Sequence, residues 1–190
     1  MYRAKFSLHY SKGEHKYLNQ AERLTFLEVT KTCKTDTKLF CQLLYYTGAR
    51  ISEILNLSIG NIDFDNDTVV IETLKKRQKG IYREIPLPKH LLHDLLTYID
   101  NLDHVDDDTR LWWFSPRTAS RRVKKIMHKA HITGVRSCAR GLRHGFAVYA
   151  VGKVPLTLVQ KWLGHASLET TAIYLEVVGP EERAMARRIW

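Results

Sequence analysis

Cysteine is scarce in this chain of 190 residues, and its few copies form no framework. The three cysteines, Cys33, Cys41 and Cys138, are odd in number and match no zinc-binding spacing. Such a set does not supply the paired disulfides that hold small secreted domains together. We therefore expect a protein of a reducing, cytoplasmic compartment.

Long apolar runs are lacking as well. The N-terminal stretch MYRAKFSLHYSKGEHKY has no apolar segment of the signal-peptide kind, and no other stretch is long enough to span a bilayer. We find no internal repeat, no low-complexity segment and no second domain, and we expect no membrane partner. Because 44% of the residues are hydrophobic, the chain has enough apolar material for the core of one domain.

Acidic residues are outnumbered by basic ones. The chain has 30 Lys and Arg against 20 Asp and Glu, which gives a formal net charge of +10 and an isoelectric point near 9.6. An excess of this size favours a polyanionic partner, but proteins of membrane surfaces and merely basic proteins share it. Charge alone therefore leaves nucleic acid as one candidate among several.

The most informative stretch runs from position 140 to position 174. Apolar residues at helical spacing predict helices over 142–150 and 156–163, and Ser167 is typical of a cap for a third, short helix. Arginine presents a planar, permanently charged fork that fits phosphate oxygens, so this stretch suits chemistry on a phosphodiester. Its polar side chains, which can meet at one end of a helical layer, are Arg140, Arg143, His144, His165 and Tyr174.

The rest of the chain predicts further helices and one hairpin. Capping signals at Asn19 and Asp36 begin two helices, and Gly48 ends the second of them. Three more helices are predicted over 50–57, 90–101 and 118–130, and β-branched residues predict an antiparallel hairpin from strands over 68–74 and 82–85. The expected class is α+β, mostly helical with a small antiparallel sheet.

Three separate motifs resemble those of one known family. Leu142-Arg143-His144, Leu163-Gly164-His165 and Tyr174 look like the C-terminal signature of the tyrosine recombinases, the phage-integrase superfamily, and TGARISEI at 47–54 resembles its first arginine box. Any one of these motifs would be weak, but their order and spacing match the family. The resemblance implies a catalytic domain over 17–176, preceded by a basic flexible arm (1–16). It is followed by a tail (177–190) that docks on another subunit or packs on its own domain.

The resemblance implies a site-specific DNA recombinase that needs no cofactor and no metal. Tyr174 would attack a scissile phosphate and form a 3′-phosphotyrosyl bond. Arg50 and Arg143 would hold the nonbridging oxygens, His165 would hydrogen-bond the phosphate, and Lys75, or its neighbour Lys76, would protonate the leaving 5′-oxygen. Glu53 and His144 are expected to orient these groups without reacting themselves.

The chain departs from the family pattern at Arg140, where histidine or lysine is usual. A guanidinium binds phosphate but cannot accept a proton, so we expect an electrostatic role for Arg140. His144 is a candidate substitute for the missing acid–base group. Three other tyrosines, Tyr45, Tyr46 and Tyr149, are expected to be packing residues, with Tyr149 on a buried stripe.

The hairpin tip and the helix over 118–130 are both strongly basic. Such charge runs are often solvated surface, but the corresponding helix of an integrase-like fold lies against DNA. We therefore expect DNA contacts from Lys76, Arg77, Lys79, Arg121, Arg122, Lys124 and Lys125. The implied partners are double-stranded DNA, further copies of the chain as a tetramer on paired sites, and accessory DNA-bending proteins.

A second departure is the lack of the N-terminal domain with which most family members close a clamp around DNA. The chain is either a fragment or a naturally short member, similar to the fimbrial phase-switch invertases. Two other functions compete with recombination: a catalytically weak DNA-binding accessory or regulatory protein of the same fold, and a type IB topoisomerase. Relaxation of supercoils without paired sites would identify the topoisomerase.

Overall fold

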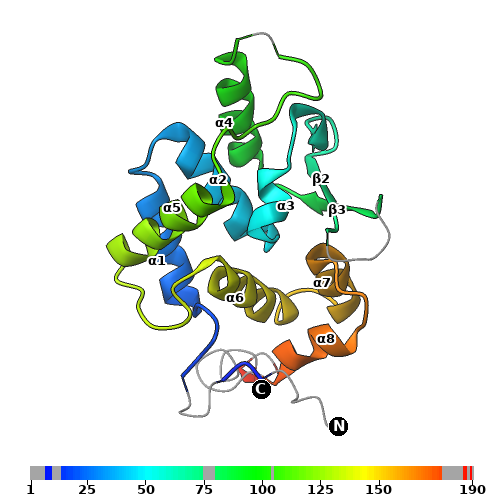
Figure 1. The fold of residues 1–190 in the computed structure, drawn as a ribbon. Helices are drawn as coiled ribbons and strands as arrows, with labels where there is room; N and C mark the ends of the chain where they lie inside the picture. The colour runs from blue at the N-terminus through cyan, green and yellow to red at the C-terminus, as the bar shows by residue number, and fades with distance from the viewer. Residues whose placement is uncertain are drawn as a thin grey trace.

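Helices make up most of the structure, with one small sheet at the side (Figure 1). The computed structural model describes residues 7–9, 14–74, 80–103, 105–176, 186–187 and 189. The expected class, mostly helical α+β with a small antiparallel sheet, is confirmed. The elements are α1 (Gln20–Thr30), α2 (Thr35–Thr47), α3 (Ile51–Leu55), η1 (Ile59–Asn61), β1 (Ile62–Asp63), β2 (Thr68–Glu72), β3 (Tyr82–Pro86), α4 (Lys89–Asp100), α5 (Pro116–Lys129), α6 (Ala139–Val151), α7 (Leu156–Leu163), α8 (Glu169–Ala172) and η2 (Ile173–Leu175).

Side-chain caps mark the beginning of α1 and α5. Asn19 and the helix's third residue, Glu22, form the predicted reciprocal capping box of α1. Helix α5 begins two residues before the predicted start because the Ser115 hydroxyl accepts a hydrogen bond from the Thr118 amide. Helix α6 begins three residues early, at Ala139, because its first three residues, Ala139, Arg140 and Gly141, precede the apolar pattern that starts at Leu142.

The sheet is antiparallel in the order β1-β2-β3. Val69 pairs with Ile85 and Ile71 pairs with Arg83, so these four side chains share the inward face. Strand β2 ends two residues earlier than predicted, at Glu72. The inward face is apolar except for Arg83, which is a buried charge in a hydrophobic setting.

Helix α2 is the centre of the larger core and packs against α1, α4 and α6. Helix α6 also faces a second, smaller cluster beneath α7, in which Phe146, Val159, Leu163 and Tyr174 are buried. The same helix therefore joins the main body to the C-terminal helices (Figure 1). This double contact brings the predicted motifs of α6, α7 and η2 to one place.

One packing prediction is wrong. Tyr149 is 37% exposed rather than buried, and the cationic ends of Arg23 and Lys153 lie 5.4 and 4.8 Å from the centroid of its ring. The apolar stretch at 111–114, after α4, forms a patch that is divided, with Trp112 in the core and Trp113 78% exposed. Adjacent residues of an extended segment point to opposite sides, so only part of such a patch can face the core.

Part of the predicted N-terminal arm contacts the domain. Leu8 is buried in the smaller core cluster, and its carbonyl accepts a hydrogen bond from the Lys16 amide at 2.8 Å. A bridge pairs His9 with His15. The boundary between arm and domain stays a prediction.

Gly48 permits the turn that leads from α2 to the first arginine box. Its φ is +61°, and a Cβ atom there would lie 2.3 Å from Cδ1 of Phe146. We expect Gly48→Ala to lower the free energy of unfolding by about 3 kcal/mol, since a left-handed backbone and overpacking both oppose a side chain. Gly80→Ala is the matched control in urea unfolding, because Gly80 has a φ of +79° and no heavy atom within 4 Å of the added Cβ. Equal losses in the two variants would show that the Phe146 contact contributes nothing.

Candidate active site

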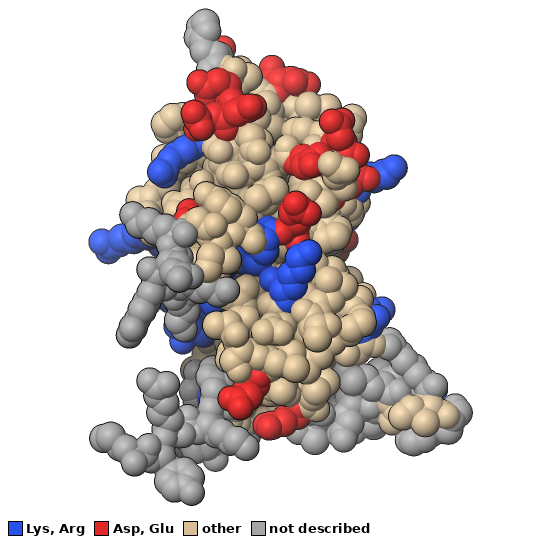
Figure 2. Space-filling model, turned by 90° about the vertical axis from the view of Figure 1, so that its right-hand side faces the viewer, with Lys and Arg blue, Asp and Glu red and all other residues tan. Residues whose placement is uncertain are grey.

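An open cleft of about 740 Å³ lies where α3, α6 and the segment after α7 meet. It brings together every predicted catalytic residue within the described part of the chain, together with His144. Its lining is Ala49, Arg50, Ile51, Ser52, Ala139, Arg140, Arg143, His144, His165, Thr170, Ile173 and Tyr174. On the face shown in Figure 2, acidic side chains gather toward the α4 end, and Lys and Arg side chains lie in the middle.

Arg50 lies directly before the first turn of α3. Its backbone amide and its Nη1 both donate to the Glu53 carboxylate, at 2.8 and 2.7 Å. The ion pair between these two residues exists, but it is no surface salt bridge, because the Glu53 side chain is fully buried. Arg50 remains partly exposed to the cleft and so can hold a ligand while its inner side is fixed.

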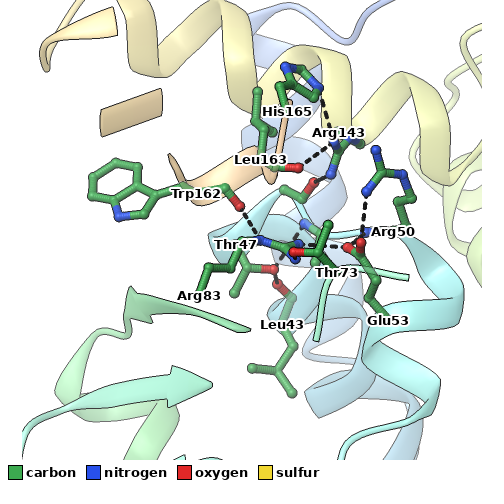
Figure 3. Close-up of polar contacts among 12 residues, drawn as sticks. Leu43, Thr47, Arg50, Glu53, Thr73, Arg83, Arg143, Trp162, Leu163 and His165 are labelled. Carbon is green, nitrogen blue, oxygen red and sulfur yellow. Dashed lines mark hydrogen bonds and ion pairs between the residues drawn. The ribbon is translucent and has the colours of Figure 1, made fainter. Parts of the chain in front are cut away.

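Glu53 has a second cationic partner that the sequence did not place in the site. Arg83 Nη2 donates to the Glu53 carboxylate (Figure 3), and the two atoms are 2.7 Å apart. Burial alone would raise the pKa of the Glu53 carboxyl, but the charge of Arg83 and the hydrogen bonds from Arg50 and Arg83 lower it below its ordinary value. The carboxylate is therefore charged at neutral pH and balances the two arginines.

Arg143 projects from α6 and is almost fully buried behind the cleft. Its Nη1 donates to the Gly48 carbonyl at 2.8 Å, and its Nη2 donates to the Leu163 carbonyl at 2.7 Å. Burial and the neighbouring charge of Arg50 lower the pKa of Arg143 to about 10, so the group is charged at neutral pH. Its guanidinium is thus fixed in position before any ligand arrives.

His165 follows the left-handed Gly164 that ends α7. Its Nε2 lies 3.1 Å from Arg143 Nη2, and its Nδ1 lies 2.9 Å from the hydroxyl of Thr171. Arginine only donates, so Nε2 is the acceptor, and the partners assign the proton of the neutral ring to Nδ1. Thr171, which is fully buried, thereby fixes the imidazole; no signal in the sequence marked this residue.

Tyr174 lies in η2, at the end of the cleft, and is only 1% exposed. Its hydroxyl is 2.8 Å from His144 Nδ1, and its ring is stacked with that of His165. Burial raises the pKa of Tyr174 to about 12, against the opposing charges of Arg143 and Arg50. The phenol is therefore protonated at neutral pH, and His144 is the group that contacts it.

Arg140 lies one turn before His144 on α6, is exposed and faces the cleft. Burial, together with the charges of Arg143, Arg140 and Lys16, lowers the pKa of His144 to about 4. The imidazole at the phenol is thus neutral. Arg140, which occupies the position where the family usually has histidine, is one of the causes of the lowered pKa of His144.

The low pKa of His144 predicts a pH-dependent stability. The folded-state pKa of about 4 is below the ordinary histidine pKa of 6.5, so the unfolded chain binds more protons between these values. Stability should fall as the pH falls through this window, by about 3 kcal/mol at pH 4. We expect His144→Asn to remove that part of the slope in urea unfolding measured across this range. An unchanged slope in His144→Asn would contradict the assignment.

The predicted DNA-binding residues are only partly described. Arg121, Lys124 and Lys125 are exposed on α5, as a DNA-contacting role requires. Arg122 differs, because its guanidinium pairs with Asp36 and lies 4.1 Å from the Phe114 ring centroid. Its contact with DNA stays a prediction, as do those of its neighbours. Lys75, Lys76, Arg77 and Lys79 lie outside the described residues.

Two further properties concern the described part of the chain only. There, no three histidine, cysteine, aspartate or glutamate side chains are grouped as metal ligands would be. No helix among those residues has the length and apolar character needed to cross a membrane.

Comparison with known proteins agrees with this geometry. Residues 16–179 match the phage integrase family. Tyrosine recombinase XerA of Pyrococcus furiosus is 32% identical over 183 residues, which cover 91% of this chain and 61% of the relative. Tyrosine recombinase XerH of Campylobacter jejuni is 32% identical over 170 residues, which cover 83% of this chain and 47% of the relative. The chain thus spans less than two thirds of the length of these relatives.

Solved structures show the same fold. A crystal structure of XerA recombinase superposes with a TM-score of 0.77 at 25% identity, covering 90% of this chain and 64% of that one. XerH bound to palindromic difH substrate in a post-cleavage complex gives a TM-score of 0.75 at 26% identity, covering 92% and 53%. The fold and the cleft therefore define a tyrosine-recombinase catalytic domain. The chain belongs to the phage integrase family, and the predicted resemblance is confirmed.

Proposed function

We propose that this chain is the catalytic domain of a site-specific DNA recombinase, which cleaves and rejoins DNA through a 3′-phosphotyrosyl intermediate. The observation that carries the proposal is the convergence of Arg50, Arg143, His165 and Tyr174 on one cleft. These four residues come from α3, α6, the turn after α7 and η2. Their types match what an attack on a phosphodiester needs: cations, a hydrogen-bond donor and a nucleophile.

Arg50 and Arg143 would bind the nonbridging oxygens of the scissile phosphate. Both guanidinium groups are held from behind, by Glu53 and by two backbone carbonyls, so little reorganisation is needed when charge develops in the transition state. His165 would add a hydrogen bond from the same side. This role requires its Nε2 to carry a proton when phosphate is bound, and an adjacent anion favours that protonated state.

Tyr174 would supply the attacking oxygen. Its Oη forms the new bond to phosphorus, the bond from phosphorus to the 5′-oxygen breaks, and one phosphodiester replaces another. The phenolic proton must leave, and we assign His144 Nδ1 as its acceptor because the two atoms are 2.8 Å apart. The phenol donates to Nδ1 when the imidazole proton is on Nε2, which is the tautomer that this role needs.

The leaving 5′-oxygen needs a proton as well. Lys75, with Lys76 as the alternative, remains our proposed general acid because it follows strand β2 in the sequence, three residues after the strand ends at Glu72. Arg140 would bind phosphate without exchanging protons. No cofactor is required in this scheme, because each bond that breaks is replaced by one of the same kind.

The wider assembly is part of the same proposal. Double-stranded DNA would be the substrate, bound partly by the exposed cations of α5, and two DNA sites would be paired by a tetramer of the protein. Accessory DNA-bending proteins and a nucleoid-associated, cytoplasmic location would follow from that activity. XerH is bound to its difH substrate in a solved structure, which supports DNA as the partner here.

Arg140 favours a second candidate, a catalytically weak DNA-binding accessory protein of the same fold. Its guanidinium occupies the cleft at a position where the family usually has a group that can exchange protons. The two candidates differ in whether the chain forms a covalent bond with DNA.

A nicked suicide duplex built on a DNA site that the chain binds separates these functions. After cleavage the short 5′-ended strand diffuses away, so any phosphotyrosyl adduct accumulates and survives denaturant. An adduct with the wild-type chain supports the recombinase. Salt-dependent binding of the same duplex without an adduct would support the accessory protein and overturn the enzymatic proposal.

A further inference from the structure

We propose that Arg83 is a positioning residue for this reaction: one buried guanidinium that fixes the phosphate-binding Arg50 and His165 relative to each other. The inference rests on the proposed function, because it assigns roles around the same cleft. Arg83 does not line the cleft and so touches no substrate. It acts only through the residues that do.

The contacts of Arg83 join three separate elements. Its Nη2 donates to Glu53 of α3 at 2.7 Å, its Nη1 donates to the Thr73 hydroxyl at 2.9 Å, and its Nε donates to the Trp162 carbonyl at 2.7 Å. Figure 3 shows these partners around one guanidinium. The side chain is 4% exposed, so none of these bonds competes with bulk water. A planar fork can satisfy three such directions at once, which an ammonium on a flexible stem cannot do as well.

One arm of the network runs to His165. The C-terminal carbonyls of a helix carry partial negative charge, and cations near them are stabilising. Two consecutive backbone carbonyls at the end of α7 each accept a hydrogen bond from an arginine. The Trp162 carbonyl accepts from Arg83, and the Leu163 carbonyl accepts from Arg143. Gly164 then packs on the Arg83 guanidinium so closely that a Cβ atom there would lie 3.2 Å from Cζ. Arg83 therefore fixes the turn from which His165 enters the cleft.

The other arm runs to Arg50. Glu53 is shared, with Oε2 facing Arg83 and Oε1 facing the Arg50 side chain. Without Arg83, the buried carboxylate would have Arg50 as its only cationic partner in the network and would draw that side chain inward. Arg83 thus sets how far Arg50 can reach toward a phosphate.

Stability alone gives a poor account of a charge at this place. The neighbours of Arg83 on the inward face of the sheet are Val69, Ile71 and Ile85, among which an aliphatic side chain would pack. Replacing a complete buried ion pair by apolar residues is often neutral or stabilising. The specific property of the arginine is geometric, since its three bonds connect supports of two separate phosphate-binding groups.

The test compares single-turnover rates of adduct formation on two nicked duplexes with saturating protein. One duplex has the natural scissile phosphate, and the other has a methylphosphonate, in which a methyl group replaces one nonbridging oxygen and removes its charge. We expect Arg83→Met to slow cleavage of the phosphate about 100-fold, the order of loss for misplaced catalytic groups. On the methylphosphonate the loss should shrink to less than about 10-fold, because less charge needs stabilising. Arg83→Lys keeps a charge facing Glu53 and should be intermediate.

Lys38→Met is the matched control. It removes the ion pair between Lys38 of α2 and Asp94 of α4, ten residues before Gly48 and so about 15 Å along the helix from the cleft. This variant should lose stability without a change of rate on either substrate. Arg83→Lys serves in place of Arg83→Met if the latter does not fold.

Each outcome decides the inference. Equal losses on both substrates, or a folded Arg83 variant with the wild-type rate, would overturn it. If the wild-type chain formed no adduct, the proposed function would fail, and the side-chain ¹⁵N shifts of His165 would decide the positioning separately. The single-tautomer pattern expected for wild type should be lost in the Arg83 variant, and an unchanged pattern would contradict the inference.

Discussion

Tyr174→Phe is expected to abolish the denaturant-resistant adduct between this chain and a nicked DNA duplex. The substitution removes only the phenolic oxygen, and this oxygen is the nucleophile of the proposed reaction. No partial activity should remain, because phenylalanine cannot form a phosphodiester. The loss should exceed about 10⁴-fold, the range in which removal of a chemical nucleophile is usually found.

The fold and DNA binding should survive this substitution. Tyr174 is buried with its hydroxyl at His144, so the variant should be destabilised by about 1–3 kcal/mol, the cost of leaving a buried polar partner unsatisfied. Tyr149→Phe is the control, because Tyr149 is partly exposed, has Arg23 and Lys153 near its ring, and does not line the cleft. An adduct with undiminished yield in Tyr174→Phe would place the nucleophile elsewhere, and peptide mapping of the adduct would identify it.

Much of this site could be predicted from sequence because its residues occupy local signals. Gly48 marks the end of α2 and so places Arg50 at the start of the next helix. In the same way, the left-handed Gly164 ends α7 and turns His165 into the cleft. Capping and helical spacing act over a few residues, so they can be recognised without knowledge of the packing.

The supports of these residues could not be predicted, since they depend on contacts between distant elements. Arg83 and Glu53 are thirty residues apart, and Arg83 and Trp162 are seventy-nine residues apart. The only local signal was alternation in β3, which puts Arg83 on the same face as Ile85. Thr171 gave no signal, because a threonine in a short helix is ordinary until its hydroxyl meets His165.

The departure at Arg140 gains a physical meaning from the contact between His144 and Tyr174. The sequence left His144 as a substitute for the usual acid–base group, and its Nδ1 indeed lies at the phenol. Arg140 and His144 are four positions apart on α6. The charge of Arg140 therefore helps to keep His144 neutral and able to accept a proton. The phosphate of bound DNA would offset that charge and raise the pKa of His144 when proton transfer is needed.

Arg143→Lys should have the second largest effect, a loss of cleavage rate of at least about 10³-fold. Lysine keeps the positive charge but cannot donate to the Gly48 and Leu163 carbonyls while facing the cleft, so one of these carbonyls loses its partner. The shift of the group away from His165 would also release the imidazole. Single-turnover adduct formation measures this effect, with binding of the same duplex measured separately at several salt concentrations.

Arg136→Lys is the matched substitution, because Arg136 pairs with Glu22 of α1 outside the cleft and a lysine can keep that ion pair. Its cleavage rate should equal that of the wild type. If Arg143→Lys cleaved within about 10-fold of wild type, charge alone would suffice, and the fixed bidentate geometry argued for Arg143 would be wrong. If instead Arg143→Lys lost DNA affinity and cleavage rate by the same factor, Arg143 would stabilise the ground state and the transition state equally. Its role would then be to bind the DNA and not to accelerate the chemical step.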